Sequence, residues 1–171
     1  EKFKNLVWEE RKIQPHDTRW TEYVEEALKE AEQPLTPPTP MTDGGSEQFR
    51  RWLNTNIRPQ KQDGYVVATV TLPLGDVTPT QLRVLADVAR RFTRETIRTT
   101  VEQNFVIRWV SKGDLPALFD TLEAAGLDQA GAGSIVDIVA CPGTDTCKLG
   151  ISSSRGLAAE LRQRIIARNG A

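Results

Sequence analysis

The sequence is poor in the side chains that most often build catalytic and metal centres, with two cysteines, one histidine and one methionine in 171 residues. Two cysteines cannot form a disulfide-rich scaffold, and their scarcity favours a reducing, cytoplasmic compartment. The lone histidine, His16, has no second imidazole to pair with, so we expect a solvated turn residue. No apolar run is long enough to span a bilayer and no signal-peptide pattern opens the chain, so no membrane partner is expected.

Net charge is also nearly absent: 22 basic and 23 acidic residues leave −1. The bulk charge therefore offers nothing to attract a nucleic acid or an acidic lipid. The length is enough for one good hydrophobic core, or for one compact domain with a tail. Because the first residue is Glu1 and not methionine, we expect an excised or processed piece.

The first segment, residues 1–46, is predicted to be a helical arm followed by a linker. Apolar residues recur at helical spacing on both sides of Pro15, which indicates two short amphipathic helices. The linker, 33–46, is rich in proline, which favours an extended and semi-rigid course. A globular domain is expected to begin at residue 47.

Residues 47–130 follow the order β-α-β-β-α. The β-branched run 65–72 predicts a strand, and Thr78-Pro-Thr-Gln81 carries the signals of a helix start. Two further strands, 97–101 and 105–110, flank a tight turn, and a last helix ends near Gly126. The sequence predicts an α+β fold containing a ferredoxin-like split β-α-β unit, with helices on one face of the sheet and the other face free.

Residues 131–171 are predicted to begin a second, incomplete α/β module. The run 135–140 is expected to form a strand that leads into a cysteine-containing loop. Ser152-Ser-Ser154 can cap a final helix whose narrow apolar stripe has no later element to cover it.

The two cysteines lie in the word Cys141-Pro-Gly-Thr-Asp-Thr-Cys147. Pro142-Gly143 should turn the backbone and present both sulfurs on one loop, which suits a soft metal or an iron–sulfur cluster. Two thiolates are half of the usual four. Two reduced structural thiols, or a disulfide in an oxidising compartment, are the alternatives. Lys148 and Arg155 would lower the pKa of the thiols if they lie close.

Three separate words, in order, resemble the nitrite/sulfite reductases that carry sirohaem and a 4Fe-4S cluster. They are Arg58-Pro-Gln-Lys-Gln-Asp-Gly64, the stretch Ile97–Ile107 that contains Val101-Glu-Gln-Asn104, and the cysteine word with its continuation to Arg155. Together they cover roughly residues 50 to 165. The resemblance implies the second ferredoxin-like repeat and the start of the second cluster-binding module of that family.

The resemblance also implies roles for individual residues. Cys141 and Cys147 would be two of the four cluster ligands, and the family's second pair, a C-x3-C, is absent from the sequence. Gln103 and Asn104 would lie in the hairpin that faces sirohaem, although an asparagine is also common in tight turns. Arg98 and Arg108 flank the hairpin and would pair either with sirohaem carboxylates or with surface acids.

The function implied is the six-electron reduction of nitrite to ammonia or of sulfite to sulfide, with ferredoxin or a flavoprotein as electron donor. The rest of the parent reductase would be the main partner of this chain, which we expect to be inactive alone and to lack a proper cluster. No catalytic residue is assigned. The alternative is a ferredoxin-like interaction or regulatory domain whose thiols are incidental or form a redox switch.

Overall fold

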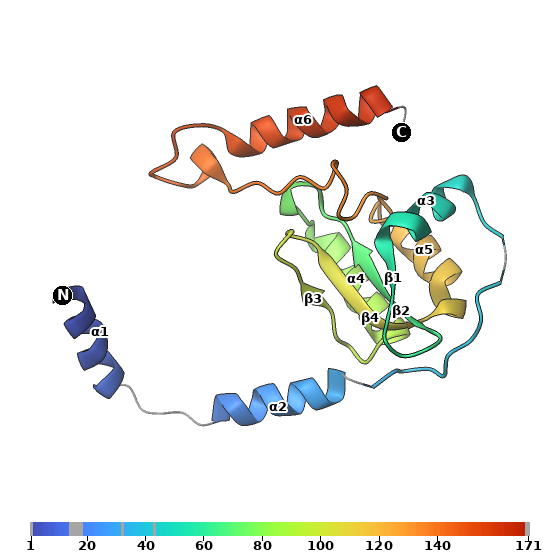
Figure 1. Ribbon diagram of the computed structural model, residues 1–171, viewed down its shortest axis with the longest axis horizontal. Helices are drawn as coiled ribbons and strands as arrows, with labels where there is room; N and C mark the ends of the chain where they lie inside the picture. Colours follow the sequence, from blue (N-terminus) through green and yellow to red (C-terminus); the bar gives the residue numbers. More distant parts are fainter. Residues whose placement is uncertain (1, 14–18, 32, 43, 170–171) are drawn as a thin grey trace. The chain divides into compact units, whose positions relative to one another are not determined.

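The computed structural model in Figure 1 describes residues 2–13, 19–31, 33–42 and 44–169. The chain divides into two compact units, Glu1–Glu32 and Gln33–Ala171. The first unit contains α1 (Lys2–Ile13) and α2 (Arg19–Ala31), so both predicted helices of the arm are confirmed. His16 lies outside the described residues. No helix in the described ranges is long and apolar enough to cross a membrane.

The second unit is built on a four-stranded antiparallel sheet in the order β1-β2-β4-β3. The strands are β1 (Ile57–Pro59), β2 (Tyr65–Val70), β3 (Arg98–Thr99) and β4 (Phe105–Ser111). Because β4 is antiparallel to both β2 and β3, those two strands run parallel with β4 between them. The predicted split β-α-β unit and the α+β class are confirmed. The edge strand β1 was missed because three residues that include a proline show no period-two pattern.

Three helices of this unit contribute side chains to one core with the sheet: α3 (Glu47–Asn56), α4 (Pro79–Phe92) and α5 (Leu115–Glu123). Short 3-10 turns occur at Pro73–Gly75, Lys112–Asp114 and Gly143–Asp145. The start of α4 is the predicted capping box, in which Thr78 and Gln81 satisfy each other's backbone N–H groups. The largest buried side chains of the core include Trp52, Val70, Val88, Ile107, Val110, Leu118 and Leu122.

The proline-rich stretch, which begins the second unit, packs on the sheet along part of its length. The Tyr65 hydroxyl donates to the Thr36 carbonyl at 2.8 Å, and the Thr39 N–H donates to the Ser111 hydroxyl at 2.9 Å. The Gly113 N–H donates to the Thr39 carbonyl, also at 2.9 Å. Residues 36–39 are therefore held against the ends of β2 and β4. The domain boundaries at residues 46 and 130 stay predictions.

The predicted strand at 135–140 is wrong. This segment joins no strand ladder, and residues 129–140 form an irregular connection, hereafter the crossing segment. Backbone groups near its two ends, at residues 129–132 and at Ala140, pair with side chains of α3 and of the β3–β4 hairpin in place of a neighbouring strand. Apolar residues in it are correspondingly exposed, Ile135 by 70%. The final helix is confirmed as α6 (Ser154–Asn169), and its Ala158 is buried.

Candidate functional site

The cysteine word folds into a tight loop around a short 3-10 turn. The Cys147 N–H donates to the Gly143 carbonyl and the Gly150 N–H donates to the Cys147 carbonyl, both at 3.0 Å. A Cβ at position 150 would lie 2.9 Å from the backbone of Gly143, so glycine permits this close approach. Cys141 and Cys147 are both exposed and both free. The predicted presentation of two thiols by one loop is therefore observed.

Cys141 is tied to the first turn of α6. Its Sγ lies 3.2 Å from the Ser154 hydroxyl, which also lies 3.0 Å from the Cys141 carbonyl. The Ser154 hydrogen bond, aided by the Gly143 backbone, lowers the pKa of the Cys141 thiol. Neither Lys148 nor Arg155 contributes to this shift, so their predicted effect on the Cys141 thiol is not found. Arg155 instead pairs with Asp76 and lies 3.6 Å from a carboxylate oxygen of Asp145.

Gln103 reaches from the β3–β4 hairpin to the residue before Cys141. Its Nε2 donates to the Ala140 carbonyl at 3.0 Å, and the Ala140 N–H donates to its Oε1 at 3.4 Å. Gln103 occupies the left-handed region with φ 62°. The side chain is confined by Gly75, where an added Cβ would lie 3.2 Å from the Gln103 Cβ.

Asn104 is 3% exposed, and its side chain, like that of Gln103, bonds to groups within the protein. Its Oδ1 accepts from the Leu72 N–H at 2.8 Å, and its Nδ2 donates to both carboxylate oxygens of Asp137 at 3.0 Å. Asp137 also accepts from the Gly133 N–H at 2.8 Å. Gln103 and Asn104 thus meet the crossing segment, and their predicted contact with a cofactor stays a prediction.

A third amide, Asn56, holds the other end of the crossing segment. It is fully buried between α3 and β1, and its Nδ2 donates to the carbonyls of Thr69 and Gln129 at 2.8 and 3.0 Å. Its Oδ1 accepts from the N–H groups of Gly131 and Ala132. Sequence reasoning passed over Asn56, because an asparagine at a helix end usually indicates only a helix stop.

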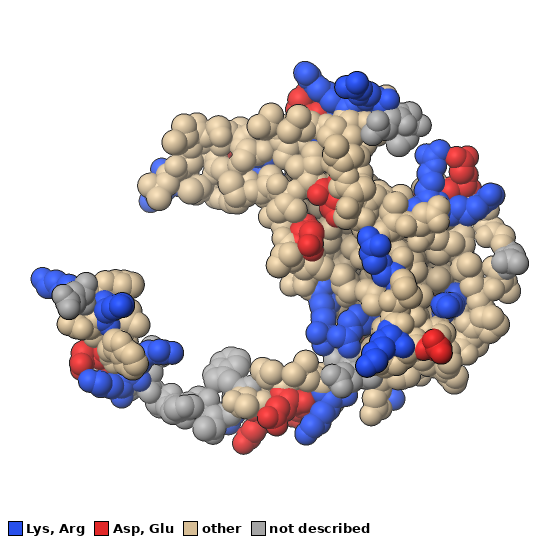
Figure 2. Space-filling model, in the orientation of Figure 1, with Lys and Arg blue, Asp and Glu red and all other residues tan. Residues whose placement is uncertain are grey.

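Three arginines share the face of the sheet opposite the core, hereafter the arginine face (Arg58, Arg98 and Arg108). Arg58 pairs with Val67 and Arg98 pairs with Val106, and directly paired residues share a face. Arg108 lies two residues beyond Val106 and so points the same way. Figure 2 shows Lys and Arg side chains gathered over the strands in this view. In the part of the chain described, these three arginines have no hydrogen-bond or ion-pair partner.

A β-bulge shapes this face. Val66 pairs with Val110 but Ala68 pairs with Ile107, so one residue of β2 opposes Arg108 and Trp109. Trp109 has φ 62°, and its N–H donates to the Gln60 Oε1 at 3.0 Å. The extra residue turns Val110 toward the core and leaves Trp109 outside it. The Trp109 ring instead meets Tyr65 edge-on, with centroids 5.4 Å apart.

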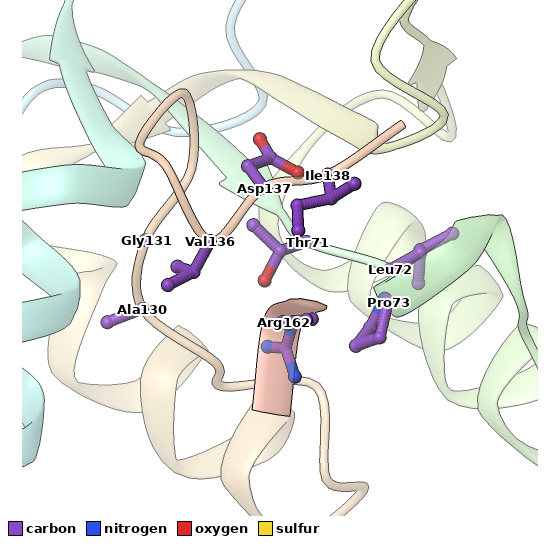
Figure 3. A pocket seen from close by; sticks show the side chains of 9 residues that line it. All are labelled: Thr71, Leu72, Pro73, Ala130, Gly131, Val136, Asp137, Ile138 and Arg162. Carbon is purple, nitrogen blue, oxygen red and sulfur yellow. The ribbon is translucent and has the colours of Figure 1, made fainter. Parts of the chain in front are cut away.

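The crossing segment also borders a small crevice beside α6 (Figure 3). It is lined by residues 71–73, which follow β2, by residues 130–131 and 136–138 of the crossing segment, and by Arg162. Its volume of about 10 Å³ is room for about one water. Arg162 donates to the Gln129 Oε1 at 2.7 Å. A crevice this small cannot hold a substrate. The candidate site consists of the arginine face and the cysteine loop.

The donor set of the chain fits half of an iron–sulfur cluster. The cysteine loop supplies two exposed thiols, and a four-thiolate cluster needs two more. Among the described residues no group of three or more His, Cys, Asp or Glu could hold a metal ion. Any cluster bound here must therefore take its other ligands from beyond the described residues.

Comparison with known proteins identifies the family of the segment that contains the sheet. The family described as the nitrite/sulfite reductase ferredoxin-like half domain matches residues 58–125, which span β1 to α5. A ferredoxin–nitrite reductase of Leptolyngbya laminosa is 32% identical over 125 residues, 70% of this chain and 24% of the relative. Residues 58–125 belong to the nitrite/sulfite reductase family. The resemblance read from the sequence is confirmed.

Further relatives agree with this reductase assignment. The chloroplastic ferredoxin–nitrite reductase of Oryza sativa subsp. japonica is 36% identical over 84 residues, 48% of this chain and 14% of the relative. The NADH nitrite reductase large subunit of Escherichia coli (strain K12) is 30% identical over 106 residues, 61% of this chain and 12% of the relative. The chain thus spans at most about a quarter of the length of these relatives. All three are nitrite reductases, so the half domain comes from an oxidoreductase family.

The reductase half domain contains four of the six predicted site residues: Arg98, Gln103, Asn104 and Arg108. The cysteine pair lies C-terminal to it, and the Gln103–Ala140 contact brings hairpin and cysteine segment together. Asp137 and Ser154 were missed as site residues. An acid inside an otherwise apolar run, Ile135-Val-Asp-Ile-Val139, was the available signal for Asp137.

Proposed function

We propose that this chain forms part of the cofactor cradle of a sirohaem- and 4Fe-4S-dependent nitrite or sulfite reductase. One observation carries the proposal. The open sheet face of a reductase half domain carries three arginines without a partner among the residues that the structure describes, and its hairpin is hydrogen-bonded to the residue before Cys141. The proposed carboxylate site and the proposed pair of thiolate ligands would then lie on connected parts of one unit.

The chemistry of the side chains fits the two cofactors. Guanidinium groups bind carboxylates through paired, charge-assisted hydrogen bonds, so Arg58, Arg98 and Arg108 would hold the acidic substituents of sirohaem. The thiolates of Cys141 and Cys147 would supply two cluster ligands, and residues elsewhere in the full-length protein would supply the rest. The bound cofactors supply the six-electron reduction, while this chain binds and orients them.

The relatives favour one substrate and one donor. Two of the three described above are named ferredoxin–nitrite reductases, so we propose nitrite as substrate and reduced ferredoxin as donor, in the cytoplasm. Sulfite and a flavoprotein donor are the alternatives within the same family. The chain alone should be inactive, because it supplies only two of the four cluster ligands.

The test uses the full-length protein, purified without air. We expect the absorbance bands of sirohaem and of the cluster, and reduction of nitrite with reduced methyl viologen as the electron donor. Assays with sulfite as a competing substrate decide the substrate preference. Arg98→Ala and Arg108→Ala should each weaken sirohaem retention roughly tenfold, because each removes a charge-assisted contact. Arg83→Ala, an exposed arginine on α4, is the control and should change nothing. A colourless full-length protein would refute the proposal and favour the interaction domain.

A further inference from the structure

We infer that Gln103 and Asn104 are positioning residues, which hold the backbone leading into Cys141 and do not themselves contact a cofactor. The inference rests on the proposed function. It follows from where their polar atoms go, since both side-chain amides are used on the crossing segment and its neighbours.

Gln103 fixes the orientation of two peptide planes at once. The Ala140 N–H belongs to the peptide that joins residues 139 and 140, and the Ala140 carbonyl belongs to the peptide that joins Ala140 to Cys141. Gln103 binds both groups, at 3.4 and 3.0 Å. The position of the Cys141 backbone is thereby tied to the hairpin.

The backbone of Gln103 supports a selected role for its side chain. A left-handed residue in a turn is normally glycine or asparagine, and another residue there costs about 1 kcal/mol. Glutamine holds this position with φ 62°. An outlier of this kind suggests that the side chain is needed where it lies.

Asn104 provides the second tether, at Asp137, which lies three residues upstream of Ala140. Its amide donates to both Asp137 oxygens, and its carbonyl oxygen accepts from Leu72. Being 3% exposed, Asn104 keeps no free donor for an external carboxylate. Two adjacent hairpin residues therefore hold the crossing segment at Asp137 and at Ala140. The hairpin and the backbone that precedes Cys141 are thereby expected to move as one body.

The first experiment measures amide exchange in the full-length protein with Gln103→Asn. Asparagine tolerates the left-handed backbone but is one methylene too short to reach Ala140. Exchange at residues 138–141 should quicken roughly tenfold, as for loss of one structural hydrogen bond. The β3–β4 pairing should keep its protection. Glu102→Gln, in the same turn and exposed, is the matched control and should match the unsubstituted protein.

The second experiment measures how fast acid-labile sulfide is lost from the same proteins under a ferrous chelator. Residues that orient metal ligands typically change metal affinity by 10- to 100-fold, so Gln103→Asn should lose sulfide roughly tenfold faster at an unchanged urea midpoint. The inference would be overturned, with the proposed function left intact, by either of two results. One is equally fast loss of sulfide from Gln103→Asn and Glu102→Gln, and the other is unchanged amide exchange at Ala140 in Gln103→Asn. An unsubstituted protein without sulfide would overturn the proposed function and the inference together.

Discussion

The side-chain amide of Asn104 lies 3.0 Å from each carboxylate oxygen of Asp137. This contact joins the turn of the β3–β4 hairpin to the crossing segment, 33 residues later in the chain. Asp137 completes its pairing with the Gly133 N–H. Because the Asn104 amide is neutral, it does not neutralise the charge of Asp137. It supplies directed N–H donors to the carboxylate. The contact therefore requires an amide on one side and an acid on the other.

Asn104→Asp tests that dependence, because it sets two carboxylates against each other. The chain should lose about 2–4 kcal/mol of unfolding free energy in urea at pH 7. Like-charge repulsion raises the pKa of the introduced carboxyl above its unfolded value, so the penalty should shrink as pH falls toward 5. The double variant Asn104→Asp/Asp137→Asn restores one amide and one acid and should recover most of the stability. No recovery in the double variant would contradict this account.

Asn56→Ala should be more damaging than a typical surface change. It removes four hydrogen bonds to the backbone of the sheet and of the crossing segment, and leaves buried groups without partners. We expect a loss of roughly 3 kcal/mol in urea unfolding. Asn54→Ala, on the same helix but exposed, should cost less than about 0.5 kcal/mol. Equal effects at positions 54 and 56 would show that the buried network adds no stability.

Thr78→Ala should weaken the start of α4. The Thr78 hydroxyl accepts from the Gln81 N–H at 3.2 Å, and Gln81 returns a bond to the Thr78 N–H. Loss of such a cap costs about 1 kcal/mol, measurable as a lower urea midpoint. Thr80→Ala changes an exposed threonine within the same first turn and serves as control. A Thr78→Ala midpoint equal to that of the control would mean that the cap contributes nothing.

Ser154→Ala should move the alkylation profile of Cys141. The Ser154 hydroxyl is the main cause of the lowered pKa of this thiol. Its removal should shift the midpoint of iodoacetamide alkylation to higher pH and slow the reaction at neutral pH. Cys147 in the same molecule is the internal reference, and Ser153→Ala the neighbouring control. A profile unchanged in Ser154→Ala, or shifted equally by Ser153→Ala, would contradict this assignment.

The elements of the half domain were predictable where one local signal dominated. The capping box at Thr78 placed the start of α4, and the β-branched run from Tyr65 placed β2. Both signals act within a few residues, and tertiary contacts reinforce them. The crossing segment shows the opposite case. Its run from Ile135 is typical of a strand, but the structure holds it at two points, the Asp137 side chain and the Ala140 backbone, through Asn104 and Gln103, more than thirty residues upstream.

The candidate site was predictable in part for the same reason. The spacing of Cys141 and Cys147 indicated one loop, and that loop is present. The common face of Arg98 and Arg108 follows from strand register once β4 is known. The bulge at Trp109 could not be read from the sequence, since its left-handed backbone depends on an acceptor from Gln60. The internal use of Gln103 and Asn104 likewise depends on a partner segment that the sequence had indicated to be a strand of a separate module.

Acid-labile sulfide in the full-length protein, purified without air, tests the proposed role of the cysteine pair most directly, because sirohaem carries iron but no sulfide. The unsubstituted protein should contain about four sulfides per chain. Cys141→Ser and Cys147→Ser should each lose most of them, while Ser153→Ala keeps them. Sulfide absent from the unsubstituted protein, or retained in full by both cysteine variants, would contradict the account.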